Sequence, residues 1–126
     1  MFENIKNNAI IILDQAGSIL EWNLSAKTIF GFTKDEMVGK HFSKLFLPED
    51  AINNKPYYEL EEAKKFGKFR VENSWMVRKD KSRFWVSGTI SALIKNSGEL
   101  VGFVKIIRDL TDIKNYQEAI EKDKKN

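Results

Sequence analysis

The sequence contains no cysteine, which excludes disulfide bonds, thiol nucleophiles and cysteine metal sites. Its only histidine is His41, so no histidine cluster is available to a metal ion. No apolar run approaches the roughly 20 residues that a membrane-crossing helix needs, and no signal peptide opens the chain. We therefore expect a cytoplasmic domain with no metal site and no direct membrane insertion.

The charged residues show no clustering of one sign. Lys and Arg number 21 against 18 Asp and Glu, which gives a net charge of +3, and both signs are mixed along most of the chain. In the tail, residues 121–126, acidic residues interrupt the lysines, which is typical of a solvated helix end. Because a nucleic-acid-binding face needs clustered basic side chains, we expect no nucleic-acid partner.

The 126 residues, 42% of them hydrophobic, suit one compact domain. The first half of the chain predicts a β-hairpin followed by short helices. Two apolar strands, 9–13 and 18–22, flank a turn at 14–17. Asn23 can cap a short helix after this hairpin, and Gly31 ends that helix where left-handed geometry is wanted.

Further helical segments follow before the hydrophobic pattern changes from helical to strand periodicity. Thr33 and Glu36 have the spacing of a capping box, which predicts another helical turn. One more turn starts at His41 and closes at residues 47–48. A longer helix is expected over 56–66.

Three long strands come next and complete the predicted fold. They cover 69–79, 83–94 and 100–108, with turn-rich segments between them, so an antiparallel meander follows. The fold class is therefore α+β: a five-stranded antiparallel sheet, with short helices inserted after the second strand on one face and a C-terminal exit helix. The expected parts are an N-terminal cap segment, a core and a signalling helix, over residues 1–8, 9–110 and 111–126.

The exit helix carries an unusual apolar pattern. It starts near Thr111, where Asp109 or Thr111 itself can cap it. Ile113, Tyr116 and Ile120 form a narrow apolar seam on an otherwise polar helix. A seam this narrow buries little surface alone and needs a partner helix or a sheet face.

Short motifs follow one another in a fixed order along the chain. In the N-terminal half they are Asp14-x-x-Gly17, Trp22-Asn23, Phe30-Gly31-Phe32, Glu36-x-x-Gly39 and Leu47-Pro48-Glu49-Asp50. In the C-terminal half they are Trp75-Met76-Val77-Arg78-Lys79-Asp80, Arg83-Phe84-Trp85, Gly102-Phe103 and Arg108-Asp109-Leu110-Thr111. This ordered set, which covers about residues 9–114, resembles the PAS family. One departure from the family's pattern is Lys81, because the family's hairpin usually carries glycine at this position. Glycine adopts a positive φ easily, whereas lysine resists it.

The resemblance implies a sensory or signal-relay domain of the kind found in sensor kinases and other two-component proteins. Such a domain is expected to dimerise and to pass its signal to an effector such as a histidine kinase, in the same chain or in a partner. Asp109 and Thr111 are the expected relay residues. An enzyme is not expected, since Glu59, Glu61 and Glu62 have the spacing of a solvated helix face and no second histidine exists.

The resemblance also places a ligand site between the helices and the sheet. The residues expected to line this site are apolar, which suits a small hydrophobic ligand, or core packing with no ligand at all. An anionic metabolite would need converging cations, for which Arg70, Arg78 and Lys105 are available. The residues expected to look inward are Phe42, Leu45, Met76, Val86, Ile90, Phe103 and Ile107.

The residues at the family's cofactor-binding positions limit which cofactors this chain is expected to bind. Phe42 stands where photosensory flavin domains need a cysteine, so covalent flavin photochemistry is excluded. The strand positions that would hold a flavin ring are Met76, Val86 and Ile107, which offer no amide. Haem is not expected, because the only histidine precedes the helix that carries the ligand in haem sensors. A non-covalent FAD stacked on Trp75, as in a redox sensor, stays open as an alternative.

The outer face of the expected sheet is more apolar than a solvent-exposed face should be. An apolar patch of this kind indicates a covering element or a protein interface. The candidate covers are residues 2–7, the exit helix and a second copy of the chain, and a homodimer is the outcome we expect. The expected interface residues are Trp75, Trp85, Leu93, Val104, Ile106, Ile113, Tyr116 and Ile120.

Overall fold

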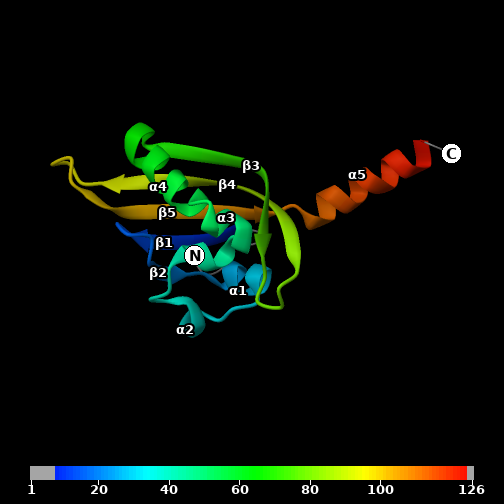
Figure 1. Ribbon diagram of the computed structural model, residues 1–126, viewed down its shortest axis with the longest axis horizontal. Helices are drawn as coiled ribbons and strands as arrows, with labels where there is room; N and C mark the ends of the chain where they lie inside the picture. The colour runs from blue at the N-terminus through cyan, green and yellow to red at the C-terminus, as the bar shows by residue number, and fades with distance from the viewer. Residues whose placement is uncertain (1–7, 125–126) are drawn as a thin grey trace.

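The computed structural model describes residues 8–124 and shows strands and helices in the expected order (Figure 1). The strands are β1 (Asn8–Asp14), β2 (Ile19–Trp22), β3 (Lys68–Val77), β4 (Arg83–Ile94) and β5 (Leu100–Asp109). The helices are α1 (Leu24–Phe30), α2 (Lys34–Met37), the short 3₁₀ helix η2 (Phe42–Leu45), α3 (Pro48–Ile52), α4 (Lys55–Phe66) and α5 (Thr111–Lys124). Residues 2–7, one of the three candidate covers of the sheet, lie outside the described residues.

The strands form one antiparallel sheet in the order β2-β1-β5-β4-β3. Since β1 and β5 pair along their length, the N-terminal hairpin and the C-terminal meander join into a single sheet. Figure 1 shows the short helices gathered against this sheet, and α5 leaving the end of β5 and extending beyond it. The predicted α+β architecture is confirmed. No helix within residues 8–124 is both long and apolar enough to cross a membrane.

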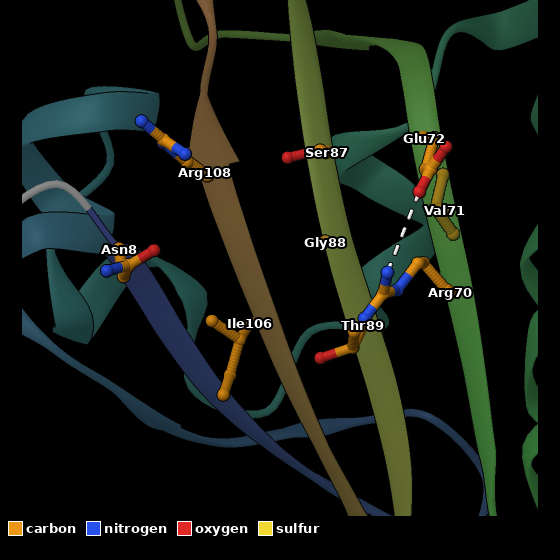
Figure 2. Close-up of a pocket in the computed structure, with 9 residues that line it drawn as sticks. All are labelled: Asn8, Arg70, Val71, Glu72, Ser87, Gly88, Thr89, Ile106 and Arg108. Carbon is orange, nitrogen blue, oxygen red and sulfur yellow. Dashed lines mark ion pairs between the residues drawn. The ribbon is translucent and has the colours of Figure 1, made fainter.

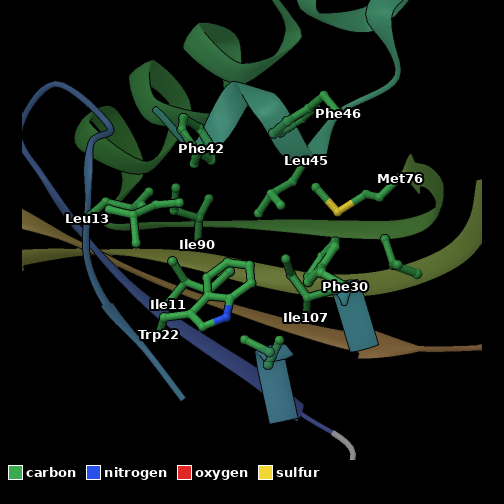
Figure 3. Packing of buried hydrophobic residues seen from close by; sticks show 14 of the residues in the cluster. Ile11, Leu13, Trp22, Phe30, Phe42, Leu45, Phe46, Met76, Ile90 and Ile107 are labelled. Carbon is green, nitrogen blue, oxygen red and sulfur yellow. The ribbon is translucent and has the colours of Figure 1, made fainter. Parts of the chain in front are cut away.

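The hydrophobic core lies between the inner face of the sheet and the helices (Figure 3). β1 contributes Ile11 and Leu13, because alternate side chains of a strand share one face. Trp22 of β2 and Phe30 of α1 contact each other, with ring centroids 5.7 Å apart. Burial of such side chains drives folding, at about 25 cal/mol for each Å² of apolar surface removed from water.

Asn23 sets the start of α1 as the sequence predicts. Its side-chain oxygen accepts from the amide of Ala26 at 3.0 Å and also from the amide of Ile10 at 3.0 Å. One side chain therefore starts the helix and ties it to β1. Gly31 ends the helix in the left-handed region, at a φ of 85°.

The helical region contains one element that the sequence does not predict. The chain is expected to close a turn at Leu47 and Pro48, whereas Pro48 begins α3. Proline is pre-organised for the first position of a helix, and Glu49 and Asp50 suit the positive end of its dipole.

The first long strand departs from unbroken alternation. The register of β3 against β4 shifts between Val71 and Ser74, and Asn73 takes a φ of 51° inside this β-bulge. In the turn between β3 and β4, Lys81 adopts a φ of 73°. Lysine thus takes the left-handed conformation that glycine would supply at less cost.

The predicted capping box at the start of α2 is present. The hydroxyl of Thr33 accepts from the amide of Glu36 at 3.2 Å, and Oε1 of Glu36 accepts from the amide of Thr33 at 2.8 Å. The other oxygen of Glu36 accepts from Nζ of Lys79 at 2.6 Å. The hydrogen bond from Lys79, together with that from the Thr33 amide, lowers the pKa of Glu36 to about 2.

The substitution Glu36→Gln should lower thermal stability at neutral pH, and its difference from the wild type should shrink in acid. Because the folded-state pKa is depressed, the stabilisation is complete above the ordinary pKa of 4.5 and is lost as pH falls through about 2. Thermal unfolding followed by circular dichroism across this window measures the effect. Lys79→Gln removes the other partner and should show the same window. A difference that stays constant throughout would contradict the assignment.

Candidate functional site

The side chains predicted to line an internal site all lie in the core. The buried set is Phe42, Leu45, Met76, Val86, Ile90, Phe103 and Ile107, several of which are labelled in Figure 3. They pack against one another and against the helices: the rings of Phe42 and Phe46, for example, meet edge to face with centroids 5.3 Å apart. The strand residues of this set face inward by the alternation of the strands, whereas Phe42 and Leu45 lie on η2. The role of the set in ligand binding stays a prediction.

A buried ion pair lies among these apolar side chains. Nζ of Lys105 on β5 donates to Oε1 of Glu59 on α4 at 2.5 Å. The two side chains are 4% and 2% exposed, the deepest burial of any ion pair within residues 8–124. The expectation that Glu59 belongs to a solvated helix face is therefore wrong.

The position of Glu59 on α4 explains its burial. It lies one helical turn from Pro56 and from Ala63, two of the buried residues of that helix, and so shares their face. Lys105 lies between two inward-facing residues in the alternation of β5. Both periodicities are present in the sequence, so alternation along β5 was the signal that could have placed Lys105 inside.

The ammonium of Lys105 is surrounded by aromatic rings as well as by a carboxylate. It lies 5.7 Å from the ring centroid of Phe42 and 5.4 Å from that of Phe46. Beside the pair is a chamber with about 10 Å³ of room for the centre of a water molecule, with Met76 and Ile107 among its walls. This is about enough for one water.

A second polar group lies where β3, β5 and α5 meet. Oδ1 of Asp109 accepts from the amide of Thr111 at 2.9 Å and from its hydroxyl at 2.5 Å. Oδ2 of Asp109 accepts from the guanidinium of Arg78 at 3.2 Å, and Arg78 also donates to the Thr111 hydroxyl at 3.3 Å. The structure brings the two expected relay residues together and adds Arg78, which the sequence did not assign to this junction.

Arg78 connects this junction to the helices and the core. It donates to the main-chain oxygen of Ile29 in α1. Its guanidinium carbon lies 3.8 Å from the ring centroid of Phe84, a buried core residue. A single side chain therefore contacts α1, the core and the start of α5.

His41 has a structural role at the start of η2. Its Nδ1 accepts from the amide of Ser43 at 3.2 Å, which leaves Nε2 to donate to the main-chain oxygen of Ala16 at 2.8 Å. Within residues 8–124, no group of three or more His, Asp or Glu side chains is placed to hold a metal ion.

The outer face of the sheet carries the expected interface residues. Trp75 of β3 and Trp85 of β4 stack there, with centroids 4.3 Å apart and 17° between the ring planes. Nζ of Lys114 lies 4.9 Å from the Trp85 centroid, so α5 begins against this pair. Trp75 therefore faces away from the core. Farther along the same face of β4 and β5 lie three partly exposed apolar residues, Leu93, Val104 and Ile106.

The apolar seam of α5 is exposed. Ile113, Tyr116 and Ile120 are 40%, 70% and 39% exposed. Because α5 extends beyond the sheet (Figure 1), this seam is available to a partner.

A polar groove of about 280 Å³ also lies on the outer face, next to the bulge of β3 (Figure 2). Arg70 lies on one side of it and Arg108 on the other, with the hydroxyl groups of Ser87 and Thr89 between them. Arg70 contacts Glu72 at 3.8 Å, the outer limit of an ion pair. The groove is therefore lined by two cations and two hydroxyl groups, together with the carboxylate of Glu72 and the apolar side chains of Val71 and Ile106.

These features agree with the comparison against known families, in which the PAS domain matches residues 7–112. The chain belongs to the PAS family. Two-component system protein A of Emericella nidulans is 40% identical over 120 residues, which cover 95% of this chain but only 17% of that protein. The PAS domain of a Colwellia psychrerythraea protein superposes with a TM-score of 0.79 at 26% identity, over 88% of this chain and 92% of that one. The PAS domain of a LuxR-family transcriptional regulator from Burkholderia thailandensis, solved in complex with ethanol, gives 0.70 at 19% identity, over 86% and 93%.

In this PAS domain the cations considered for an anionic ligand do not converge. Arg70 lies on the outer face, Arg78 is at the α5 junction and Lys105 is in the core. Non-covalent binding of FAD stays a prediction. The space beside Met76 has room for about one water, and Trp75, the expected stacking partner, faces outward.

Proposed function

We propose that this PAS domain is a signal-relay module without catalysis of its own, which acts as a homodimer and controls an effector through α5. The observation that carries the proposal is the contact set of Arg78, which joins α1, the ring of Phe84 and the relay residues Asp109 and Thr111. A change in core packing beneath Arg78 would alter the hydrogen bonds that hold the start of α5. The core would thereby bias α5 between two packings.

The effector we propose is a histidine kinase, in the same chain or in a partner. The relative from Emericella nidulans supports this choice, because it is a two-component system protein with 40% identity to this chain. The absence of catalysis is supported by the use of His41 as a cap and of Glu59 as the partner of Lys105.

The relay is tested by joining the chain, at the end of α5, to the catalytic region of a histidine kinase. Phe84→Leu serves as the input, since it changes the packing under Arg78. We expect Phe84→Leu to change autophosphorylation by about fivefold or more, the usual size of coupling between sites. In the Asp109→Ala background the same substitution should have little effect, because the link to α5 is cut.

Asp112→Ala is the matched control. Asp112 is an acidic residue in the first turn of α5, and within residues 8–124 its side chain makes no hydrogen bond to Arg78. It should leave the response to Phe84→Leu unchanged. Circular dichroism and thermal unfolding establish that each variant is folded. Equal responses in the wild-type and Asp109→Ala backgrounds would contradict the relay.

The homodimer should depend on the α5 seam. Replacing Ile113 and Ile120 by lysine introduces charge on this apolar seam and should weaken self-association. The dissociation constant of the dimer should rise about tenfold for each 1.4 kcal/mol of association free energy that is lost. Sedimentation velocity over a concentration series measures the change. Ile52→Lys is the control, since Ile52 is 79% exposed on α3, away from the seam. Equal self-association of the seam variant and the control would contradict the assignment.

A further inference from the structure

The outer face of β4 carries small polar side chains at its centre, where a central strand usually carries β-branched or aromatic ones. Three consecutive outward residues bear hydroxyl groups, and a large apolar residue lies on either side of them along the strand. In chain order the five outward residues are Trp85, Ser87, Thr89, Ser91 and Leu93. The small residues form the floor of the outer groove shown in Figure 2.

Arginines from the two neighbouring strands border this floor. Arg70 of β3 faces Thr89 across one ladder, and Arg108 of β5 faces Ser87 across the other. The register of the sheet therefore places one guanidinium group on each side of the hydroxyl groups. Two cations and two hydroxyl groups around one groove are a donor set for an anion.

Neither arginine is firmly held by a partner within the protein. The side chain of Arg108 makes no ion pair and no hydrogen bond to another residue of the described range 8–124, since the carboxylate of the adjacent Asp109 pairs with Arg78. Arg70 meets Glu72 at 3.8 Å, and these two side chains are 70% and 68% exposed. Because an exposed pair of this kind contributes little to stability, both guanidinium groups are available to a ligand.

We propose that the outer groove is a binding site for the phosphate group of a small soluble phosphate ester. Arg70 and Arg108 hold the phosphate from two sides, and the hydroxyl groups of Ser87 and Thr89 donate to its remaining oxygens. The site lies on the face of the sheet opposite to the core. It goes beyond the relay and the dimer proposed above and does not depend on them, since that dimer is assigned to the seam of α5, which extends beyond the sheet.

The donor set matches a phosphate better than a carboxylate. A phosphate monoester carries a charge of about −1.5 to −2 at pH 7 and three acceptor oxygens, whereas a carboxylate has one charge and two oxygens. Two arginines balance the larger charge, and the planar guanidinium group binds phosphate oxygens in pairs. The hydroxyl groups of Ser87 and Thr89 have no hydrogen-bond partner within residues 8–124, so they are free to donate.

The size and the charges of the groove favour a small ester over a polyanion. Its volume of about 280 Å³ is near the lower end of the range for small-molecule sites, about 300–1,000 Å³. Its described lining holds two cations, and the carboxylate of Glu72 lies beside one of them. An extended polyanion such as a nucleic acid needs a larger cluster of basic side chains without an acidic neighbour.

Binding requires Arg108 to turn. In Figure 2 its guanidinium points away from Arg70, whereas the guanidinium of Arg70 lies over Thr89. Both side chains are exposed, and changes of side-chain rotamer on binding are common at such surfaces. The side-chain resonance of Arg108 should therefore respond to the ligand together with the amides of the groove.

The test titrates the whole chain with inorganic phosphate and with glycerol phosphate, each against sodium chloride of equal ionic strength. Nuclear magnetic resonance should show saturable shifts of the Ser87 and Thr89 amides and of the Nε–H groups of Arg70 and Arg108. Each substitution, Arg70→Met and Arg108→Met, should weaken binding about tenfold, the contribution of a charge-assisted hydrogen bond. Acetate should give no saturable shift at these positions.

Arg83→Met is the matched control. It removes the same charge from an exposed arginine on β4 that pairs with Glu49, outside the groove, and should leave the affinity for phosphate unchanged. The proposal is overturned if Arg83→Met weakens binding as much as Arg70→Met and Arg108→Met do, because the attraction would then depend on net charge alone.

The ligand class has its own controls. Ser87→Ala/Thr89→Val keeps both arginines and should still weaken phosphate binding, because it removes the two hydroxyl donors. Equal affinity for acetate and phosphate, or an unchanged affinity in this double variant, would overturn the assignment to a phosphate group. Binding to vesicles that contain phosphatidic acid, without binding of either soluble phosphate, would overturn the assignment to a soluble ester.

Discussion

Replacing Glu59 by alanine should lower the free energy of unfolding by about 3–5 kcal/mol, because it leaves the buried ammonium of Lys105 without its partner. Lys105→Ala should cost a similar amount, since it strands the carboxylate. Both groups are almost fully buried, at 4% and 2% exposure, so water cannot replace the lost partner without opening the core. Urea unfolding monitored by tryptophan fluorescence measures each loss.

The double variant Glu59→Leu/Lys105→Met should be far more stable than either alanine variant, and close to the wild type. Leucine and methionine fill similar volumes without a charge to desolvate, and such exchanges are often neutral or stabilising by about 1–4 kcal/mol. A double-mutant cycle then gives the coupling between the two positions. Losses that simply add in the double variant would show that the pair acts as two independent packing residues.

Gly88→Ala should lower the free energy of unfolding by about 3 kcal/mol, near the upper end of the usual cost of overpacking. A Cβ at Gly88 would lie 2.2 Å from the main-chain oxygen of Ile106, so β4 and β5 would have to separate. Gly88 faces Ile107 in the ladder and also forms a wall of the chamber beside Lys105. The variant should therefore lose stability and also accelerate amide hydrogen exchange in β5.

Ser87→Ala is the matched control for this substitution. It changes the adjacent residue, whose side chain lies on the outer face, and should stay within about 0.5 kcal/mol of the wild type. Equal stabilities for Gly88→Ala and Ser87→Ala would mean that the sheet yields at this point without cost.

Much of the fold was predictable because its signals are local. Asn23, Gly31 and the Thr33–Glu36 pair act within a few residues, so the helix ends could be placed from capping chemistry alone. Strand alternation placed Val86 and Ile90 on one face of β4, and the resemblance to the PAS family indicated that this face looks inward. The extra helix α3 was missed because Pro48 is compatible with both a turn and a helix start.

The candidate site was less predictable, because its residues meet through the tertiary structure. The bulge at Asn73 changes which side chains of β3 face the core, and no local pattern in the sequence indicated it. Arg78 reaches Asp109 only because β3 and β5 end at the same side of the sheet, 31 positions apart in the chain. Sequence reasoning named both residues and did not place them together.

The resemblance to the PAS family supplied the inward set of apolar residues. The sequence by itself determined the order of the strands, the helix caps and the seam of α5. These depend on contacts between near neighbours and on the period of the hydrophobic pattern, which are written directly in the chain. The tertiary structure alone decided that Glu59 pairs with Lys105 across 46 positions and that Trp75 stacks on Trp85 outside the core. A charged side chain on a helix or strand is buried only where a residue of opposite charge can pair with it. Here that residue comes from a distant segment of the chain, so only the folded structure brings the two together.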